Sequence, residues 1–432
     1  MLPDDLLLPD AWPAPGPDHV ELVETHVSWV FLGEREVLKV KKPVDLGFLD
    51  FRSPERRRAA CEAEVRLNAR LAPGVYLGLV PLRRAGGGRV AASGEGAPVD
   101  WAVRMKRLDD AHRADLMLAA GALDGPRVDR VAAVVAELHA GARATARDAA
   151  RWASHSAVAR NVHENFAQTR HLVARFVDPA VAEQAEERQL ELLAHSAGLF
   201  GARIAAGHVR DGHGDLRLEH VYFEEDGLRI IDCIEFDPRY RIADGCADVA
   251  FLAMDLSAHG RVDLAERLLA RYARAIDDYG LYELVDFYAS YRAWVRGKVA
   301  ALLALDPGVG DAGRAHAAAE ARRHFLLAAA SMRPALVAPT LVCVGGWIAS
   351  GKSATSETIA GELSCPIVDA DRTRKHMFGV SETQPLLEPA WNGAYRPAVT
   401  DRVYAEVLRR ASCVLASGRP VVIDASFRSR EL

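Results

Sequence analysis

The sequence of 432 residues is short of lysine, since only seven of its 54 basic residues are lysines and the rest are arginines. Its six cysteines include no C-x-x-C pair, which excludes a zinc ribbon or a redox pair and is typical of buried thiols in a reducing cytosol. No apolar run approaches the roughly 20 residues that span a bilayer. The N-terminus carries acids and prolines where a signal peptide has a basic region and an apolar run.

The charge and these absences narrow the class of protein. A formal net charge of -5 argues against a nucleic-acid partner. The composition therefore predicts a cytoplasmic globular protein with no membrane span, no disulfides and no structural zinc. The strong bias toward arginine and alanine indicates a GC-rich bacterial genome. In such a sequence each lysine is a candidate for a role that a guanidinium cannot take.

Hydrophobic patterning predicts four parts. Strand-like alternation around the turn at 33–35 predicts a β-hairpin, and Pro54 opens a predicted helix. A helical pattern follows, interrupted at 211–248 by two strand-like runs around an acidic turn, and a Pro-containing joint precedes a new strand. The parts are a Pro-rich segment over 1–19, a strand-rich lobe over 20–108, a helical lobe over 109–335 and a strand–turn–helix region over 336–432.

The interruption at 211–248 contains two aspartates with a possible chemical role. Asp215 lies in the run HGDLRLEHVYF, and Asp232 ends the β-run LRIID. Phosphoryl transfer needs one carboxylate near the acceptor hydroxyl and another that holds Mg²⁺ on the nucleotide, and a short hairpin can present both. They follow a strand lysine, Lys39, and a helix glutamate, Glu64, and this order is more specific than either aspartate alone.

This ordered set resembles the protein-kinase-like fold of the aminoglycoside phosphotransferase family. HGDLRLEHVYF is similar to that family's catalytic loop, and IIDCIEFD to its metal-binding segment. The resemblance implies that Asp215 orients or deprotonates the acceptor and that Asp232 binds Mg²⁺. It also implies that Lys39 holds the nucleotide phosphates and that Glu64 orients Lys39. Lys41 lies on the same strand face as Lys39 and is the alternative phosphate ligand.

The sequence departs from that family at two places. His220 stands where the pattern expects an asparagine as second metal ligand, so that either one metal suffices or Glu235 compensates. The turn over the phosphates lacks a G-x-G-x-x-G, which leaves Ser28 and its neighbours as donors. Met105 is a further candidate for the nucleotide site, and His213 is a candidate catalytic-loop residue that more simply shapes the loop.

A second site follows the strand LVCVG. The run from Gly346 to Ser353 fits G-x-x-x-x-G-K-S and precedes a helix, as a phosphate-binding loop requires. Its nucleotide-binding candidates are Gly346, Ser350, Gly351, Lys352 and Ser353, with Ser353 also a Mg²⁺ ligand. Asp424 ends a later strand at the position that supports Mg²⁺.

The segment DADRTRK resembles small P-loop kinases of the gluconate-kinase and zeta-toxin kind. That resemblance implies that Asp371 contacts an acceptor and that Arg374 and Lys375 contact anions. A sheet of the usual order 2-3-1-4-5 would have only its first three strands here, with LVCVG at an uncovered edge, and the arginine-bearing lid is missing. This domain is therefore expected to bind nucleotide without efficient transfer.

Together these features predict a two-lobed α+β protein-kinase-like domain followed by a truncated α/β P-loop domain, as in bacterial fusions of the two. The expected function is transfer of a phosphoryl group from ATP or GTP, with Mg²⁺, to the hydroxyl of an aminoglycoside, a sugar or another metabolite. The alternative is a nucleotide-sensing protein or pseudokinase without small-molecule transfer. The sequence leaves the acceptor, the choice of nucleotide and the oligomeric state open.

Overall fold

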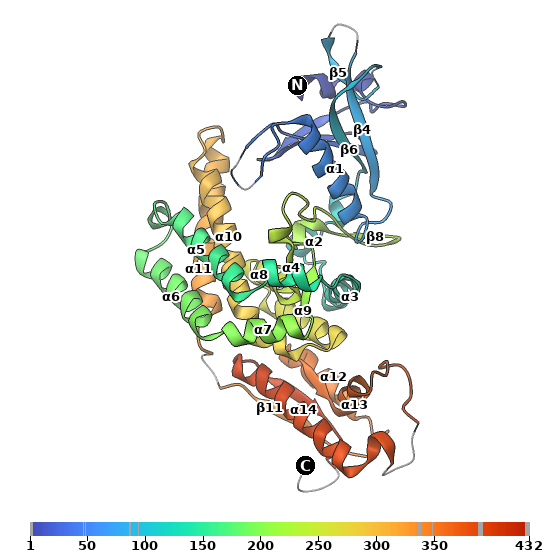
Figure 1. Cartoon of the computed structure of the whole chain (residues 1–432), viewed down its shortest axis with the longest axis vertical. Helices are drawn as coiled ribbons and strands as arrows, with labels where there is room; N and C mark the ends of the chain where they lie inside the picture. Colours follow the sequence, from blue (N-terminus) through green and yellow to red (C-terminus); the bar gives the residue numbers. More distant parts are fainter. Residues whose placement is uncertain are drawn as a thin grey trace. The chain divides into compact units, whose positions relative to one another are not determined.

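The computed structural model describes residues 3–45, 47, 49–85, 88–93, 95–335, 338–347, 349–387 and 392–427 (Figure 1). The chain divides into two compact units. Unit 1 contains residues 1–123 and 210–243, and unit 2 contains residues 124–209 and 244–432. The segment with Asp215 and Asp232 thus belongs to the same unit as Lys39 and Glu64.

Unit 1 is built on a six-stranded antiparallel sheet. Its strands are β1 (Glu21–Glu24), β2 (Ser28–Leu32), β3 (Glu36–Lys41), β4 (Tyr76–Arg84), β5 (Val90–Ala91) and β6 (Pro98–Lys106), in the order β1-β2-β3-β6-β4-β5. The predicted hairpin is confirmed, since β2 and β3 pair around the turn at 33–35 with Ser28 opposite Lys41. Successive residues of a strand face opposite sides of the sheet, so Lys39 and Lys41 share one face.

Helix α1 (Pro54–Asn68) follows β3 and packs on the sheet beside β4 and β6 (Figure 1). Ser53 caps its N-terminus by accepting a hydrogen bond from the Arg56 backbone, and Pro54 occupies the first turn, where its missing N–H costs nothing. The buried side of the helix recurs at helical spacing. It consists of Arg57, Ala60, Cys61, Glu64, Leu67 and Asn68.

The Pro-rich N-terminal segment is part of the core of unit 1. Two short 3-10 helices, η1 (Pro3–Leu7) and η2 (Pro9–Ala11), bring Leu6 and Trp12 against Phe31 and Leu38 of the sheet. Prolines fix φ and suit such turns, so a Pro-rich composition did not imply an unpacked segment.

The interruption forms the predicted hairpin. Strands β8 (Val221–Glu224) and β9 (Gly227–Ile230) pair antiparallel around the acidic turn at 225–226. Unit 1 also contains helix α2 (Ala114–Ala119). Strands β7 (Val209–Asp211) and β10 (Ile242–Asp244) precede and follow the hairpin in the sequence.

The first part of unit 2 is helical. It comprises α3 (Gly125–Gly141), α4 (Ala146–Trp152), α5 (His155–Thr169), α6 (Pro179–His195), α7 (Ala197–Ala205), α8 (Gly245–Ala258), α9 (Val262–Ile276), α10 (Val285–Leu305) and α11 (Asp311–Ser331). Ser196 separates α6 from α7, and serine favours such a break because its side chain competes for backbone hydrogen bonds. None of the helices in the described part of the chain is long and apolar enough to cross a membrane.

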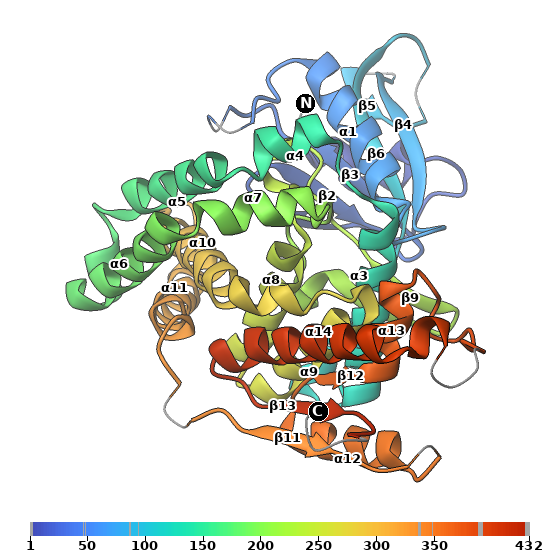
Figure 2. The ribbon, with the colours of Figure 1, turned by 60° about the horizontal axis from the view of Figure 1, so that its bottom comes forward.

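The second part of unit 2 is a small parallel sheet with helices. Strands β11 (Leu341–Val344), β13 (Val421–Asp424) and β12 (Ile367–Asp369) lie in that order, as predicted. They are joined by α12 (Lys352–Leu363), α13 (Ala370–Met377) and α14 (Pro397–Ala416), and α14 packs along β12 and β13 (Figure 2). The predicted fold class, an α+β domain followed by a short α/β P-loop domain, is confirmed.

Replacing Arg57 tests what fixes α1 on the sheet. Its buried guanidinium binds both oxygens of Asp100 on β6, at 2.7–3.0 Å, and the backbone carbonyls of Phe51 and Arg52. In Arg57→Met the buried Asp100 carboxylate loses its cation, so we expect unit 1 to lose about 3–5 kcal/mol, measured as faster hydrogen exchange of β3 and β6 amides.

The matched control is the neighbouring Arg58. Its half-exposed side chain pairs with Glu62 and lies over the Trp101 ring, so Arg58→Met should cost about 1 kcal/mol or less. Equal exchange rates in the two variants would show that the Arg57 pair does not anchor the helix.

Candidate functional site

Lys39, Glu64 and Asp232 form one chain of ion pairs in unit 1. The Lys39 Nζ lies 2.8 Å from Glu64 Oε1 and also contacts Asp232 Oδ1. The Glu64 side chain is fully buried, whereas 44% of the Asp232 side chain is exposed. The structure thus brings together a strand lysine, a helix glutamate and a hairpin aspartate that the sequence separates by up to 193 positions.

The end of α1 holds the Asp232 segment in place. Asn68 Nδ2 donates a hydrogen bond to the Glu64 carbonyl at 2.9 Å, and Asn68 Oδ1 accepts one from the Cys233 N–H at 2.9 Å. The Asp232 N–H donates to the Tyr76 hydroxyl at 3.1 Å. Asn68 and Tyr76 were not predicted, because contacts across more than 150 positions leave no local signal.

The charges of this chain stabilise one another. Burial raises the pKa of Asp232, but Lys39 and then His220 more than offset burial, so the pKa lies well below its usual range. Burial likewise raises the pKa of Glu64, and Lys39 and Lys41 reverse the effect. Burial lowers the pKa of Lys39, but Asp232 and Glu64 raise it well above its usual value. All three groups are therefore charged at neutral pH.

Asp215 lies in a tightly shaped loop. Gly214 has φ of 87°, a left-handed conformation. A Cβ at this position would lie 2.8 Å from the Tyr240 carbonyl oxygen. His213 donates from Nε2 to the Ile231 carbonyl at 2.9 Å, so it joins the loop to the Asp232 strand. The Asp215 carboxylate is bound by Arg217, with Nη2 3.0 Å from Oδ2. Arg217 was not predicted, although a charged residue two positions after the loop aspartate was a visible signal.

His220 stands between the two aspartates. Its Nδ1 donates to the Asp215 carbonyl at 2.8 Å, and its Nε2 lies 3.8 Å from Asp232 Oδ2 and 3.4 Å from Arg217 Nη2. The Nε2 atom thus faces a carboxylate and a guanidinium. His220 therefore connects the loop of Asp215 to Asp232.

Asp232 has the features of a ligand for nucleotide-bound Mg²⁺. Mg²⁺ favours carboxylate oxygens, keeps several waters and needs few protein ligands when phosphates complete its shell. The Asp232 backbone has φ of 67°, a strained conformation for a residue with a side chain and one that often marks functional sites. Among the described residues no group of three His, Cys, Asp or Glu side chains is arranged to hold a metal ion.

Three further predicted residues lie deeper in unit 1. Glu235 is 7% exposed and its Oε1 lies 2.6 Å from Lys41 Nζ. Met105 is buried in the core with Tyr76, and Ser28 is fully buried. The Ser28 hydroxyl has no hydrogen-bond partner within the described residues.

The P-loop residues surround the carboxyl end of the parallel sheet in unit 2. Gly346 and Gly351 both adopt positive φ, so the chain turns sharply between β11 and α12. Lys352 begins α12 and donates to the Trp347 carbonyl at 2.9 Å. Ser350 and Ser353 are exposed, and Ile348 lies outside the described residues. Backbone N–H groups at such a helix start can bind phosphate.

The strand ends place two aspartates beside this loop. Val344, Asp424 and Asp369 end β11, β13 and β12, and Asp424 is in register with both of the others. Burial and the nearby Asp424 raise the pKa of Asp369, although the Arg372 N–H partly opposes them. Asp424 is thus at the predicted Mg²⁺-supporting position, and Asp369 lies next to it.

The predicted acceptor residues of the P-loop part are divided between surface and interior. Asp371 is exposed and its Oδ2 lies 3.0 Å from Lys375 Nζ. Arg374 is buried, with its guanidinium over the Tyr395 ring and in contact with the Ala394 carbonyl. Arg374 is therefore part of the packing between α13 and the segment before α14.

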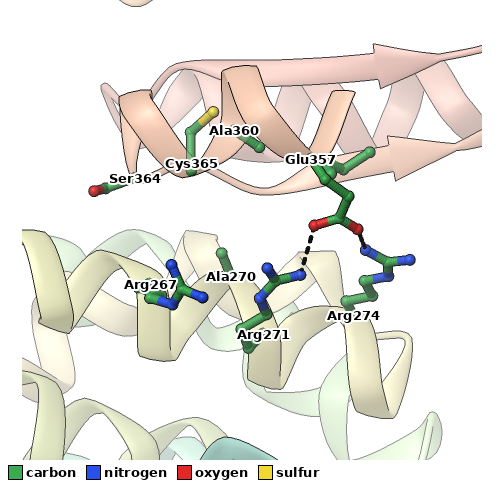
Figure 3. Close-up of a pocket in the computed structure, with 10 residues that line it drawn as sticks. Arg267, Ala270, Arg271, Arg274, Glu357, Ala360, Ser364 and Cys365 are labelled. Carbon is green, nitrogen blue, oxygen red and sulfur yellow. Dashed lines mark hydrogen bonds and ion pairs between the residues drawn. The ribbon is translucent and has the colours of Figure 1, made fainter. Parts of the chain in front are cut away.

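Ion pairs join the P-loop helix α12 to α9 in unit 2. Glu357 of α12 binds Arg271 at 2.9 Å and also contacts Arg274, as Figure 3 shows. These residues line a small pocket together with Arg267 and the C-terminal end of α12. The pocket lies against α9, so it is a feature of the contact between the helical part and the P-loop part.

Two solved structures of proteins named as small-molecule kinases are similar to this chain at low sequence identity. The GDP complex of aminoglycoside 2'-phosphotransferase-IIIa is 14% identical, with a TM-score of 0.46 over 74% of this chain and 96% of that chain. A choline/ethanolamine kinase family protein from Mesorhizobium loti is also 14% identical, with a TM-score of 0.40 over 75% of this chain and 96% of that one.

Sequence comparison defines the family. Residues 341–432 match the family described as AAA domain, AAA_33. The matched residues contain the three-stranded parallel sheet of unit 2. Uncharacterized protein Rv2004c of Mycobacterium tuberculosis is 35% identical over 421 residues, which cover 97% of this chain and 80% of that protein, and Mb2027c of Mycobacterium bovis matches equally. The chain belongs to the family of these mycobacterial proteins.

Gly214 offers a test of the loop that carries Asp215. A Cβ at this position would lie 2.8 Å from the Tyr240 carbonyl, whereas a Cβ at Gly121, which also has positive φ, would meet nothing within 4 Å. Both alanine variants incur the strain of a left-handed residue, about 1–2 kcal/mol. Gly214→Ala should lower the free energy of unfolding by about 1–3 kcal/mol more than Gly121→Ala, because the backbone must move to admit the methyl group. The loss is measured by hydrogen exchange of the β8 and β9 amides. Equal losses would mean that the loop accommodates the methyl group.

Proposed function

We propose that the chain is a phosphotransferase that moves the γ-phosphoryl group of ATP to a hydroxyl group of a small molecule. The observation that supports this most is the convergence of Lys39, Glu64 and Asp232 into one ion-pair chain next to the Asp215 loop. Such chemistry is mostly positioning and charge stabilisation, for which fixed cations and carboxylates are suited. Its acceptor is a sugar, an aminoglycoside or another hydroxyl-bearing metabolite.

Each residue has a distinct role in the proposed reaction. Lys39 binds the α- and β-phosphates, and Glu64 orients it. Asp232 holds Mg²⁺, which when bound neutralises developing charge on the phosphates. Asp215 orients the acceptor hydroxyl and accepts its proton as the acceptor oxygen bonds to the γ-phosphorus and the bond to the ADP oxygen breaks. His213 and His220 hold the loop against the Asp232 strand.

We propose a second nucleotide site at the P-loop. The glycine turn and the start of α12 supply backbone donors, Lys352 contacts the terminal phosphates, and Ser353 and Asp424 support Mg²⁺. Asp371 and Lys375 remain candidates for acceptor and anion contacts. Because this site lies in unit 2 and the Asp215 site in unit 1, variants can separate them.

A nucleotide sensor without transfer is the second candidate. The observation that favours it is the Arg217 contact on Asp215, because Arg217 Nη2 lies 3.0 Å from Asp215 Oδ2 and competes with an acceptor hydroxyl for that oxygen. Saturable nucleotide binding with no ADP formation for any acceptor would support this alternative.

The transfer proposal is tested by Asp215→Asn. With Mg²⁺ and ATP, ADP formation stimulated by a panel of sugars, aminoglycosides and nucleosides should fall by about 10²-fold to 10⁴-fold, the usual contribution of a positioned base. Asp226→Asn is the matched control, since Asp226 lies exposed in the β8–β9 turn and pairs with Arg229. A full rate in Asp215→Asn would place the transfer elsewhere.

The second site is tested by Lys352→Ala. Calorimetric titration with Mg²⁺ and a non-hydrolysable ATP analogue should show two classes of site in the native chain. One class should be lost in the variant, because the phosphates lose their ammonium partner. Lys298→Ala, which removes a lysine that bonds to Gln168, should keep both classes. Two unchanged classes in Lys352→Ala would contradict a P-loop site.

A further inference from the structure

Lys41 is the most deeply buried cation of unit 1. Only 1% of its side chain is exposed, against 13% for Lys39, although both lie on the same face of β3. Its Nζ lies 2.6 Å from Glu64 Oε2 and 2.6 Å from Glu235 Oε1. A lysine enclosed to this degree has no surface left for a nucleotide phosphate, so it is not the alternative phosphate ligand.

Apolar side chains lie beside Lys41 as well as these carboxylates. The Phe51 ring lies 5.8 Å from its Nζ, and Leu49, Phe51 and Ala60 form a hydrophobic cluster with Phe236. Burial lowers the pKa of Lys41, but Glu235 and Glu64 more than offset burial, so Lys41 stays charged. An ammonium ion in such a place is stable only when carboxylates pair with it.

Glu64 is held at both of its oxygens. Oε1 faces Lys39 at 2.8 Å and Oε2 faces Lys41 at 2.6 Å. An ion pair at one oxygen restrains the last torsion of a glutamate only loosely, because that torsion has a broad minimum, whereas ion pairs at both oxygens hold the carboxylate in one orientation. The position of Oε1, and with it the position of the Lys39 ammonium, therefore depends on Lys41.

We infer that Lys41 and Glu235 form a positioning pair, in which Lys41 fixes Glu64 so that Lys39 points at the nucleotide and Glu235 balances the charge of Lys41. The inference rests on the proposed nucleotide site of unit 1. It gives Glu235 a role that differs from the metal ligation considered from the sequence. The alternating charges of Asp232, Lys39, Glu64, Lys41 and Glu235 then act as one unit.

The test is nucleotide affinity in the full-length chain. Every variant carries Lys352→Ala, so that the titration reports the unit 1 site, and the probe is AMP-PNP with Mg²⁺. Lys41→Met should raise the Kd by about 10-fold to 100-fold, the effect of removing a residue that orients a ligand through another. The number of sites per chain should stay the same. A purely structural role would instead lower the number of sites at unchanged Kd.

A second variant guards against failure to fold. Lys41→Met combined with Glu235→Leu removes both charges and leaves no unpaired buried carboxylate, and it should still raise the Kd because Glu64 has lost its Oε2 partner. Lys42→Met is the matched control, since Lys42 pairs with the exposed Glu24. The Kd of this variant for AMP-PNP should stay unchanged. An unchanged Kd in the double variant would overturn the inference.

Lys39→Met separates this inference from the proposed function. If Lys39→Met weakens AMP-PNP binding but the Lys41 variants do not, the positioning role is wrong and the nucleotide site stands. If Lys39→Met also leaves the Kd unchanged, the proposed nucleotide site of unit 1 is itself wrong.

Discussion

The site in unit 1 depends on one fully buried carboxylate. Glu64 has no exposed surface, and a carboxylate in that position is stable only beside cations. The two lysines of β3 provide them, which fixes the rotation of α1 about its axis relative to the sheet. The Asp232 segment then follows, because Lys39 attracts Asp232 and Asn68 holds the Cys233 N–H. The contacts that hold α1 on the sheet are therefore also the contacts that form the proposed site.

In the P-loop part of unit 2 the candidate residues are positioned by the ends of parallel strands. Parallel strands bring their carboxyl ends to one edge, and there the glycine turn, Asp424 and Asp369 meet. Ion pairs lie where this part meets the helical part, and Arg410 is buried among them. Arg410 binds Asp277 through both oxygens, Arg419 binds Glu266 and Asp286, and Glu357 binds two arginines of α9. Glu357 joins the P-loop helix α12 to α9, whereas Arg410 belongs to α14 and Arg419 follows that helix.

The sequence predicted the parts of the site that have local signatures. Motif order identified Lys39, Glu64, Asp215 and Asp232, and glycine spacing identified the P-loop, because backbone turns and strand ends impose residue types locally. Contacts between distant segments that no motif marks could not be predicted. Glu235 was assigned to metal because it follows Asp232 closely, whereas its contact with Lys41 depends on how residues 194 positions apart meet.

The surroundings of Arg374 and of the Pro-rich start also depend on residues outside each segment. Arg374 was expected at an anion, but which face of α13 is buried is decided by Tyr395 and Thr400, which lie beyond the helix. The Pro-rich composition of residues 1–19 likewise gives no sign that Leu6 and Trp12 belong to the core of the sheet. Composition describes a segment but does not show what it packs against.

The most direct test of the central claim is a crystal structure of the chain, carrying Lys352→Ala, with AMP-PNP and Mg²⁺. The account predicts nucleotide phosphates at Lys39 and an ion bound to Asp232, with the γ-phosphate facing Asp215. A saturated complex in which the nucleotide lies away from Lys39 and Asp232 would contradict it.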